Sequence, residues 1–387
     1  MGDVSLTPLS EVAEVTVGFV GSMTREYVDE GIPFLRSLNV RPYRIEMADI
    51  KYIGNEFHTR IAKSKVLPGD VVMVRTGKPG QAAVVPKWLG EANCSDLIVI
   101  RPGPDLNNEW LAYFLNGMAA HAIAGQLVGA VQQHFNVKST KELLLPLPPR
   151  ETQNAIAEVL GALDDKLAAN EQVLSRTREL FAAMWQRAIA EDDSTSVPLS
   201  SLARFVNGRA YTKNATGTGR VVVRIAELNS GLGASTVYNE IDVPDDNIAR
   251  PGDLLFAWSG SLTVARWHLP EAIVNQHIFK VLPLDGQPRW VVEQALLSKL
   301  SEFRNVAADK ATTMGHIQRR HLDEPVCVPS SAQVTLVGPA MQALSDQIDA
   351  YESENFALAH TRDQLLPLLM SGKVTVKEAE TEIADLV

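Results

Sequence analysis

Two long amphipathic stretches constrain the fold of this chain more than any other feature. In the first, from Glu151 to Ile189, mostly apolar residues recur at alternating spacings of four and three. An imperfect copy runs from Ala332 to Leu369. This spacing keeps one stripe facing a partner helix, as in a coiled coil. At 1.5 Å per residue each stretch predicts a helix of roughly 50–60 Å, far longer than an ordinary globular helix.

The two stripes predict a seam between the helices. Its central residues are Leu160, Leu163, Leu167, Asn170, Leu174, Leu344, Ile348, Tyr351, Asn355 and Leu358. Asn170 and Asn355 place one amide in each stripe, where it costs stability but can fix register. Charged flanks such as Asp164 and Arg176 leave only a narrow apolar strip, which favours a helix pair over the alternative of a large helical core. Because a whole domain separates the stretches, we predict an antiparallel intramolecular pair.

The segments that precede the two helices repeat each other. Pro8-Leu9-Ser10 recurs as Pro198-Leu199-Ser200, and Gly18 recurs as Gly208. Pro68-Gly69-Asp70 recurs as Pro251-Gly252-Asp253, followed in both copies by an apolar strand and by a glycine, Gly77 or Gly260. Chance matching of one triplet is unremarkable, but landmarks in the same order indicate a tandem duplication.

The duplication sets the predicted fold class and domain boundaries. The fold class is α+β, with two similar mixed α/β domains separated by two long helices that pair as an antiparallel coiled coil, giving a pseudo-two-fold internal repeat. Short apolar runs such as Val71–Val74, Leu97–Ile100 and Leu254–Phe256 predict buried strands. The predicted parts are residues 1–150 for the first domain, 151–193 for the central helix, 194–330 for the second domain, 331–373 for the distal helix and 374–387 for a loosely held acidic tail.

Charge and cysteine content limit the classes of function. The net charge is −10, yet residues 1–150 carry as many basic as acidic side chains, so the acidity resides mainly in the helices and tail. This distribution removes an objection to nucleic-acid binding by the two domains. Cys94 and Cys327 are far apart and predict buried free thiols. No apolar run reaches the ~18–20 residues of a membrane span, and we expect a cytoplasmic protein.

Motifs for covalent chemistry are missing from the sequence. Gly77-Lys78-Pro79-Gly80 lacks the first glycine and the hydroxyl of a phosphate loop, and neither HExxH nor GxSxG occurs. His316, His321 and Cys327 fit no standard metal-site spacing, so we predict no metal site. The chain therefore predicts a non-catalytic protein.

Polar, aromatic and basic residues gather at matching places in the loops of both domains. Amides and imidazoles can read base edges, and lysine or arginine can contact phosphate. The candidate DNA-binding residues are Arg36, Arg75, Lys78, Gln132, Gln133, His134, Asn136, Lys138, Arg209, Tyr211, Lys213, Arg224, Thr313, His316, Gln318, Arg319 and Arg320. Such clusters are often only solvated surface, but their recurrence in both repeats favours a functional interpretation.

Three strings give the chain a family resemblance. They are Leu145-Pro146-Leu147-Pro148-Pro149-Arg150-Glu151-Thr152-Gln153, Gly315-His316-Ile317 ahead of Val328-Pro329, and the second helix end Leu365-Leu366-Pro367-Leu368-Leu369-Met370-Ser371-Gly372-Lys373. With these strings the chain resembles the specificity subunit of a type I restriction–modification system over nearly its whole length. One departure is that the first helix ends at Phe181–Trp185 without the proline and glycine of the second.

The resemblance implies a function and a set of partners. Each domain would be a target-recognition domain that reads one half of a split, asymmetric sequence in double-stranded DNA. The chain would scaffold two DNA adenine methyltransferase subunits and, in the restriction form, two restriction/translocase subunits. The cofactors S-adenosylmethionine, ATP and Mg would belong to those partners, and this chain would bind none. An alternative from the residues alone is a coiled-coil scaffold whose two modules bind partner proteins rather than DNA.

Overall fold

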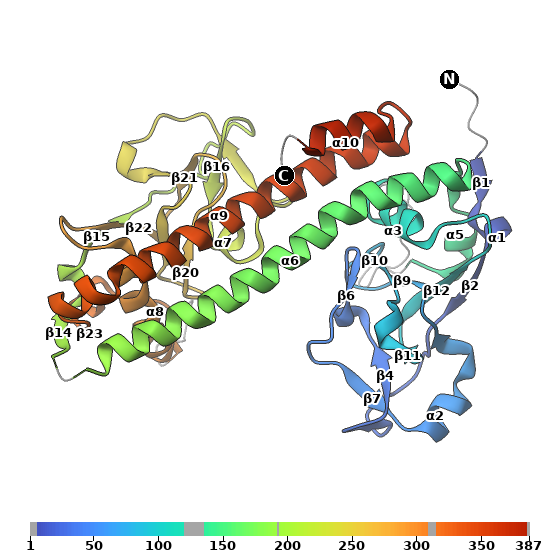
Figure 1. Ribbon diagram of the computed structural model, residues 1–387, viewed down its shortest axis with the longest axis horizontal. Helices are drawn as coiled ribbons and strands as arrows, with labels where there is room; N and C mark the ends of the chain where they lie inside the picture. Colours follow the sequence, from blue (N-terminus) through green and yellow to red (C-terminus); the bar gives the residue numbers. More distant parts are fainter. Residues whose placement is uncertain (1–5, 120–134, 192, 309–314, 385–387) are drawn as a thin grey trace. The chain divides into compact units, whose positions relative to one another are not determined.

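The computed structural model describes residues 6–119, 135–191, 193–308 and 315–384. The chain divides into two compact units (Figure 1). Unit 1 comprises residues 1–166 and 358–387, and unit 2 comprises residues 167–357. Each unit contains β-sheets together with a segment of both long helices, α6 (Arg150–Ile189) and α9 (Ser331–Met370). The α+β class with two sheet-containing domains and packed long helices is thus confirmed.

Unit 1 contains two main sheets and two short strand pairs. The first sheet has the order β10-β9-β12-β2, formed by Ala82–Val84, Val71–Val74, Leu97–Pro102 and Ala13–Val17. The second has the order β3-β7-β4-β11-β8, formed by Tyr27–Val28, Lys51–Ile53, Ile32–Leu35, Ala92–Cys94 and Lys65–Val66. The pairs are β1 (Leu6–Pro8) with β13 (Leu144–Pro146) and β5 (Val40–Arg41) with β6 (Arg44–Ile45).

Short helices complete unit 1. They are α1 (Leu9–Val12), α2 (Asn55–Arg60), α3 (Asn108–Gly117) and α5 (Val137–Lys141), with 3-10 turns η1 (Ser37–Asn39), η2 (Ala62–Ser64) and η3 (Lys87–Leu89). Helix α3 begins after Asn107, whose side chain accepts a hydrogen bond from the backbone of Trp110 at 2.8 Å. This capping satisfies an otherwise orphan N–H of the first turn.

Unit 2 repeats the strand order of unit 1, except that strand β3 and the β5–β6 pair have no counterpart among its described residues. Its first sheet is β15-β22-β19-β20, formed by Ala203–Asn207, Ile278–Pro283, Leu254–Ala257 and Thr263–Arg266. Its second sheet is β17-β16-β21-β18, formed by Val237–Asn239, Arg220–Val223, Ala272–Val274 and Ile248–Ala249. Strand β14 (Thr195–Pro198) pairs with β23 (Pro325–Val328). In each second sheet one central pair is parallel, β4 with β11 and β16 with β21. The internal repeat read from the sequence is therefore also a repeat of topology.

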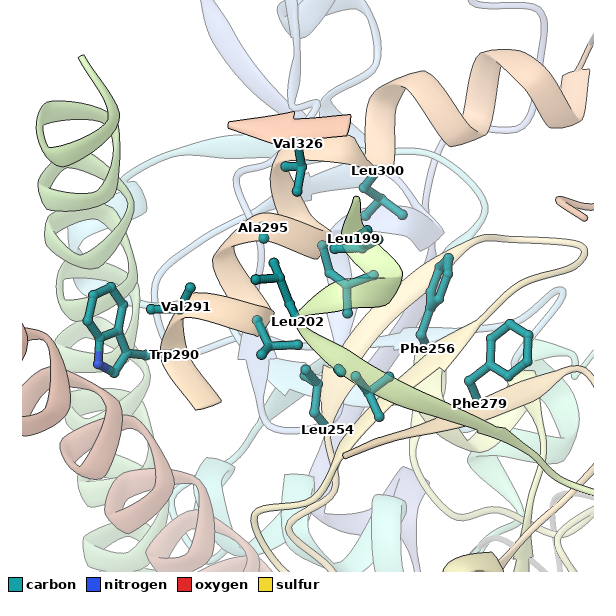
Figure 2. Packing of buried hydrophobic residues seen from close by; sticks show 14 of the residues in the cluster. Leu199, Leu202, Leu254, Phe256, Phe279, Trp290, Val291, Ala295, Leu300 and Val326 are labelled. Carbon is teal, nitrogen blue, oxygen red and sulfur yellow. The ribbon is translucent and has the colours of Figure 1, made fainter. Parts of the chain in front are cut away.

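Helix α8 covers the first sheet of unit 2. The helices of this unit outside α6 and α9 are α7 (Ile225–Ser230) and α8 (Arg289–Ala308), with 3-10 turns η4 (Leu199–Ser201), η5 (Asp245–Asn247) and η6 (Arg319–Asp323). Figure 2 shows Val291, Ala295 and Leu300 of α8 among buried side chains of the core cluster, which includes Leu254 and Phe256 of β19. Burial of such apolar surface is the main stabilising term of the unit.

Glycines explain why some landmarks recur. A β-carbon on Gly208 would lie 2.2 Å from the carbonyl oxygens of Val274 and Asn275, so no larger residue fits where β15 meets the second sheet. A β-carbon on its counterpart Gly18 would lie 2.8 Å from the Cys94 sulfur. Strand contact therefore requires glycine at the equivalent place in both units.

The two long helices pack antiparallel in unit 2. Asn170 Nδ2 donates to Glu354 Oε2 at 2.8 Å, and Thr177 bonds Gln347 at 3.2 Å, so the residue number rises on α6 as it falls on α9. In unit 1, Arg362 of α9 pairs with Asp164 of α6 at 2.6 Å. The predicted helix pairing is thus present in each unit.

The seam residues differ in burial. Leu160, Leu163, Leu358, Asn170, Leu174 and Ile348 are buried, whereas Leu167, Leu344, Tyr351 and Asn355 are half-buried. Asn355 Oδ1 is buried without a hydrogen-bond partner among the described residues, unlike the bonded amide of Asn170. Near the end of α6 the spacing of four and three continues from Leu174 to Met184, which is half-buried against the core of unit 2. Its neighbour Trp185 is also buried, because it packs edge-on against Trp290 of α8, with ring centroids 6.4 Å apart.

Two sequence expectations are corrected by the structure. Cys94 is buried as predicted, but Cys327 is exposed, because alternate residues of β23 face outward. The acidic tail predicted to be loosely held contains helix α10 (Val376–Ala384), which Thr375 and Glu378 cap reciprocally through hydrogen bonds of 2.8 and 3.3 Å. That capping box gives the short helix a defined start.

Candidate nucleic-acid interface

Matching loops follow the central strands of the first sheet in each unit. Arg75 directly follows β9, and its carbonyl accepts a hydrogen bond from Phe135 N at 3.0 Å. Trp258 directly follows β19, and its carbonyl accepts from Ile317 N at 3.0 Å. Arg75 and Trp258 are therefore structurally equivalent. We call Arg75, Lys78 and Asp96 the β9 edge, and Asn207, Trp258, His277 and His316 the β19 edge.

The β9 edge is ionic. Arg75 Nε lies 3.5 Å from Asp96 Oδ1, and the two side chains are 21% and 45% exposed. Asp96 takes a positive φ of 53°, a conformation that aspartate tolerates better than most residues. Lys78 is exposed and, within the described part of the chain, has no ion-pair partner. This edge offers both cationic donors and a carboxylate acceptor to solvent.

The β19 edge is aromatic. The Trp258 ring centroid lies 5.0 Å from that of His277 and 6.3 Å from that of His316, and its Nε1 donates to Asn207 Oδ1 at 2.8 Å. His277 also has a positive φ, 74°. His277 Nδ1 and Ser259 Oγ are buried and have no hydrogen-bond partner among the described residues. The same place in the fold thus carries different chemistry in the two units.

Several predicted DNA-binding residues have structural partners instead. Arg36 hydrogen-bonds the carboxylate and backbone carbonyl of Asp49, and this contact holds the pKa of the Asp49 carboxyl below its usual value. Arg224 donates to Glu227 at 2.6 Å and to the Ser235 carbonyl at 2.7 Å. Both arginines stabilise the start of a helical turn, where each is the residue preceding the turn.

Three further predicted residues take part in local packing. Tyr211 is only 9% exposed, and its hydroxyl donates to Asn247 at 3.1 Å. Arg319 donates to the Phe205 carbonyl at 3.0 Å. Asn136 caps α5 by accepting from Ser139 N at 2.9 Å. The Tyr211 ring lies in the core of unit 2 and supports its loop rather than facing a ligand.

The remaining described candidates lie at the surface. Lys78, Arg209, Lys213 and Arg320 are exposed and have no ion-pair partner within the described residues. Lys138 is 83% exposed and 3.9 Å from Glu142, and Gln318 is exposed at the start of η6. His316 is half-buried beside Trp258. The lysines and arginines of this group can contact phosphate without breaking a close intramolecular ion pair.

Four predicted residues fall outside the described residues, namely Gln132, Gln133, His134 and Thr313.

The sequence interpretation missed Asp96, Asn207, Trp258 and His277. A signal for one of them was present, because the offset that carries Gly77 onto Gly260 also carries Arg75 onto Trp258. His277 and Asp96 are harder to match, because unit 2 has one extra residue between the parallel bridge and the following strand. The bridges join Phe19 to Ser95 and Arg209 to Asn275, while the strands begin at Leu97 and Ile278.

Comparison with known proteins identifies the class. Residues 3–176 match the family model for the type I restriction modification DNA specificity domain. The fold is similar to the crystal structure of a type I restriction-modification system S subunit from M. genitalium, with a TM-score of 0.59 and 15% identity over 95% of this chain and 97% of that one. A crystal structure of the HsdS subunit from Thermoanaerobacter tengcongensis covers 96% of this chain and 97% of its own length at 17% identity, with a TM-score of 0.35. No match was found among curated protein sequences.

Residues 3–176 therefore belong to the family of type I restriction–modification DNA specificity domains. Unit 2 repeats the strand order of unit 1, and the fold of the chain is similar to that of the M. genitalium S subunit over 95% of its length. None of the helices in the described ranges is long and apolar enough to cross a membrane. Nor do those ranges hold a cluster of three or more His, Cys, Asp or Glu side chains suited to a metal ion.

Proposed function

We propose that this chain is the non-catalytic DNA-recognition subunit of a type I restriction–modification complex. Each unit binds one half of a bipartite, asymmetric target in duplex DNA. The observation that supports this most directly is that one strand order, repeated in both units, presents an ionic edge in unit 1 and an aromatic edge in unit 2. Two domains with the same strand order but different side chains at the β9 edge and the β19 edge are suited to reading different half-sites.

The partners follow from the same proposal. Two DNA adenine methyltransferase subunits bind the chain and, in the restriction form, two restriction/translocase subunits join them. Methyl transfer requires the target adenine to leave the base stack and enter the active site of a methyltransferase subunit. S-adenosylmethionine, ATP and Mg belong to those partners, and the complex acts on DNA in the cytoplasm.

Phosphate contacts in this proposal come from the exposed cations near the two edges. Lys78 and Lys138 serve unit 1, while Arg209, Lys213 and Arg320 serve unit 2. Contacts of this kind position a protein on the duplex and make its affinity fall with salt, whereas edge residues supply sequence preference. Both contributions are needed, because phosphate contacts alone carry no sequence information.

The test is to map methylated adenines in genomic DNA from cells that express the methyltransferase subunits with and without this chain. We expect one split sequence to be methylated only when the chain is present. Adding four residues near Asn170 and four near Asn355 should lengthen the unread spacer while both half-sites stay the same. A methylation pattern that does not depend on this chain would contradict the proposal and favour a scaffold that binds proteins.

A further inference from the structure

The ion pair of the β9 edge is built differently from the pair of Arg36 with Asp49 in the same unit. Arg75 Nε lies 3.5 Å from Asp96 Oδ1 but is buried without a hydrogen-bond partner among the described residues. Arg75 has no other polar side-chain partner in the described parts of the unit. By contrast, Nη2 of Arg36 donates hydrogen bonds to the backbone carbonyl and to the carboxylate of Asp49. The donor face of the Arg75 guanidinium is therefore not occupied by a second carboxylate.

The backbone fixes both members of this pair. The Arg75 carbonyl is bonded to Phe135 N at 3.0 Å, directly after the fully buried strand β9. Asp96 is held between β11 and β12 by the bond from its N–H to the Phe19 carbonyl at 3.3 Å. Rigid attachment reduces the entropy lost when a side chain contacts a base. A partly exposed pair at this distance that makes no hydrogen bond adds about 1 kcal/mol of stability or less, so folding alone gives little reason for it.

A carboxylate at a DNA-binding edge repels phosphates, and a hydrogen bond accepted from a base offsets that repulsion. Arginine bonds the O6 and N7 acceptors of guanine, and aspartate accepts from N4 of cytosine. In the major groove, one G·C pair presents these acceptors and this donor side by side. A neighbouring guanidinium and carboxylate are therefore chemically complementary to a single G·C pair.

We propose that Arg75 and Asp96 are specificity-determining residues that together read one G·C pair in the half-site bound by unit 1. The inference rests on the proposed function and names the base pair that this edge takes. Unit 2 lacks both groups at the matching place, where Trp258 packs against His277. Unit 2 therefore has no arginine and carboxylate that would select G·C at the matching position of its own half-site.

The test compares adenine methylation maps of complexes that contain the wild-type chain or Arg75→Gln. Glutamine pairs with adenine in the way that arginine pairs with guanine, so Arg75→Gln should shift one position of one half-site from G·C toward A·T. Discrimination for G·C at that position should fall roughly 10- to 100-fold. Arg44→Gln is the matched control, because Arg44 is an exposed arginine of the same unit that pairs with Glu46 at 3.3 Å; its methylation map should equal that of wild type.

Two further variants keep the inference falsifiable if Arg75→Gln reduces methylation altogether. Arg75→Lys keeps the charge but loses the fork of donors, and Asp96→Asn keeps an acceptor. Each should weaken the G·C preference at the same single position, whereas Trp258→Phe should affect only the other half-site. Unchanged preference in both variants, or a change in both half-sites, would overturn the inference. A wild-type complex that methylates no split sequence would instead refute the proposed function.

Discussion

Units 1 and 2 share one strand order but hold their helix segments by different chemistry. In unit 1, the buried amide of Gln153 on α6 accepts from Asn107 N at 2.8 Å and donates to the carbonyls of Asp105 and Pro148, both at 2.9 Å. In unit 2, the buried guanidinium of Arg266 on β20 bonds Glu293 of α8 at 2.9 Å and Asp349 of α9 at 2.9 Å.

The two units therefore kept the same topology after the duplication, but a neutral amide holds the helix segment in one and a buried ion pair holds it in the other. A neutral amide can be removed at the cost of a few unsatisfied backbone groups. Removal of one member of a buried ion pair leaves uncompensated charge, which costs more. Unit 2 should therefore be more sensitive than unit 1 to loss of its central polar residue.

The largest effect is expected for Arg266→Leu. The substitution leaves the carboxylate of Glu293 without its guanidinium, whereas Asp349 keeps its contact with Arg289. The uncompensated charge of Glu293 should lower the free energy of unfolding of unit 2 by about 3–5 kcal/mol. Hydrogen exchange followed by mass spectrometry should show loss of protection in β22 and little change in β12. The control Arg204→Leu breaks an exposed pair with Asp246, whose side chains are 55% and 42% exposed, and should cost less than about 1 kcal/mol. Equal effects of the two substitutions would contradict the comparison.

A smaller effect is expected for Gln153→Ala. It leaves the Asn107 N–H and two carbonyls without partners, which should lower the free energy of unfolding of unit 1 by about 1–3 kcal/mol. Here the protection of β12 should fall and that of β22 should stay. Gln172→Ala, at an exposed position of the same helix, is the matched control and should leave both unchanged. A loss confined to unit 2 would show that Gln153 does not act where its hydrogen bonds lie.

The smallest effects concern pH and have opposite signs in the two units. Burial of the Glu227 carboxyl opposes ionisation, but hydrogen bonds from Arg224 outweigh it and lower its pKa below the ordinary 4.5. Glu227 therefore stabilises unit 2 above that pH, and the stabilisation is lost as pH falls through its folded-state pKa. Burial raises the pKa of Asp70 in unit 1 above the ordinary 3.8, so its contribution is present at lower pH and is lost as pH rises through the raised value.

Variants isolate these two groups from the other carboxylates. The destabilisation caused by Glu227→Gln should shrink as pH falls below about 4.5, while Asp70→Asn should gain stability relative to wild type as pH rises above about 4. Hydrogen-exchange protection, corrected for the intrinsic exchange rate at each pH, measures both differences. Parallel pH dependence of the two differences would contradict the assigned shifts.

The buried strands and the long helices could be predicted from the sequence because local residue patterns encode them. The buried strands β9, β12 and β19 are continuous apolar runs, and the alternating spacing in α6 predicts which face meets α9. Trp185, next to the predicted position Met184, is also buried because a third helix, α8, contacts α6, and heptad spacing describes only a two-helix seam.

The edge residues were harder to predict because long-range contacts decide which polar side chains remain available. Nothing near Arg36 in the sequence reveals Asp49 as its partner, and Tyr211 meets Asn247 only after the second sheet forms. Residue type alone therefore placed both among the DNA-binding candidates. Arg75 and Lys78 differ from them only in what the fold brings near.

Because the two cysteines are unequally buried, the rates at which their thiols are alkylated report on local opening of the chain. Cys94 lies in the core of unit 1, where burial raises the pKa of its thiol, whereas Cys327 on β23 of unit 2 is exposed. An alkylating reagent should thus modify one thiol per native molecule rapidly. Modification of the second would require unit 1 to open, so the labelling rate of Cys94 gives a residue-specific clock for that opening without any engineered probe.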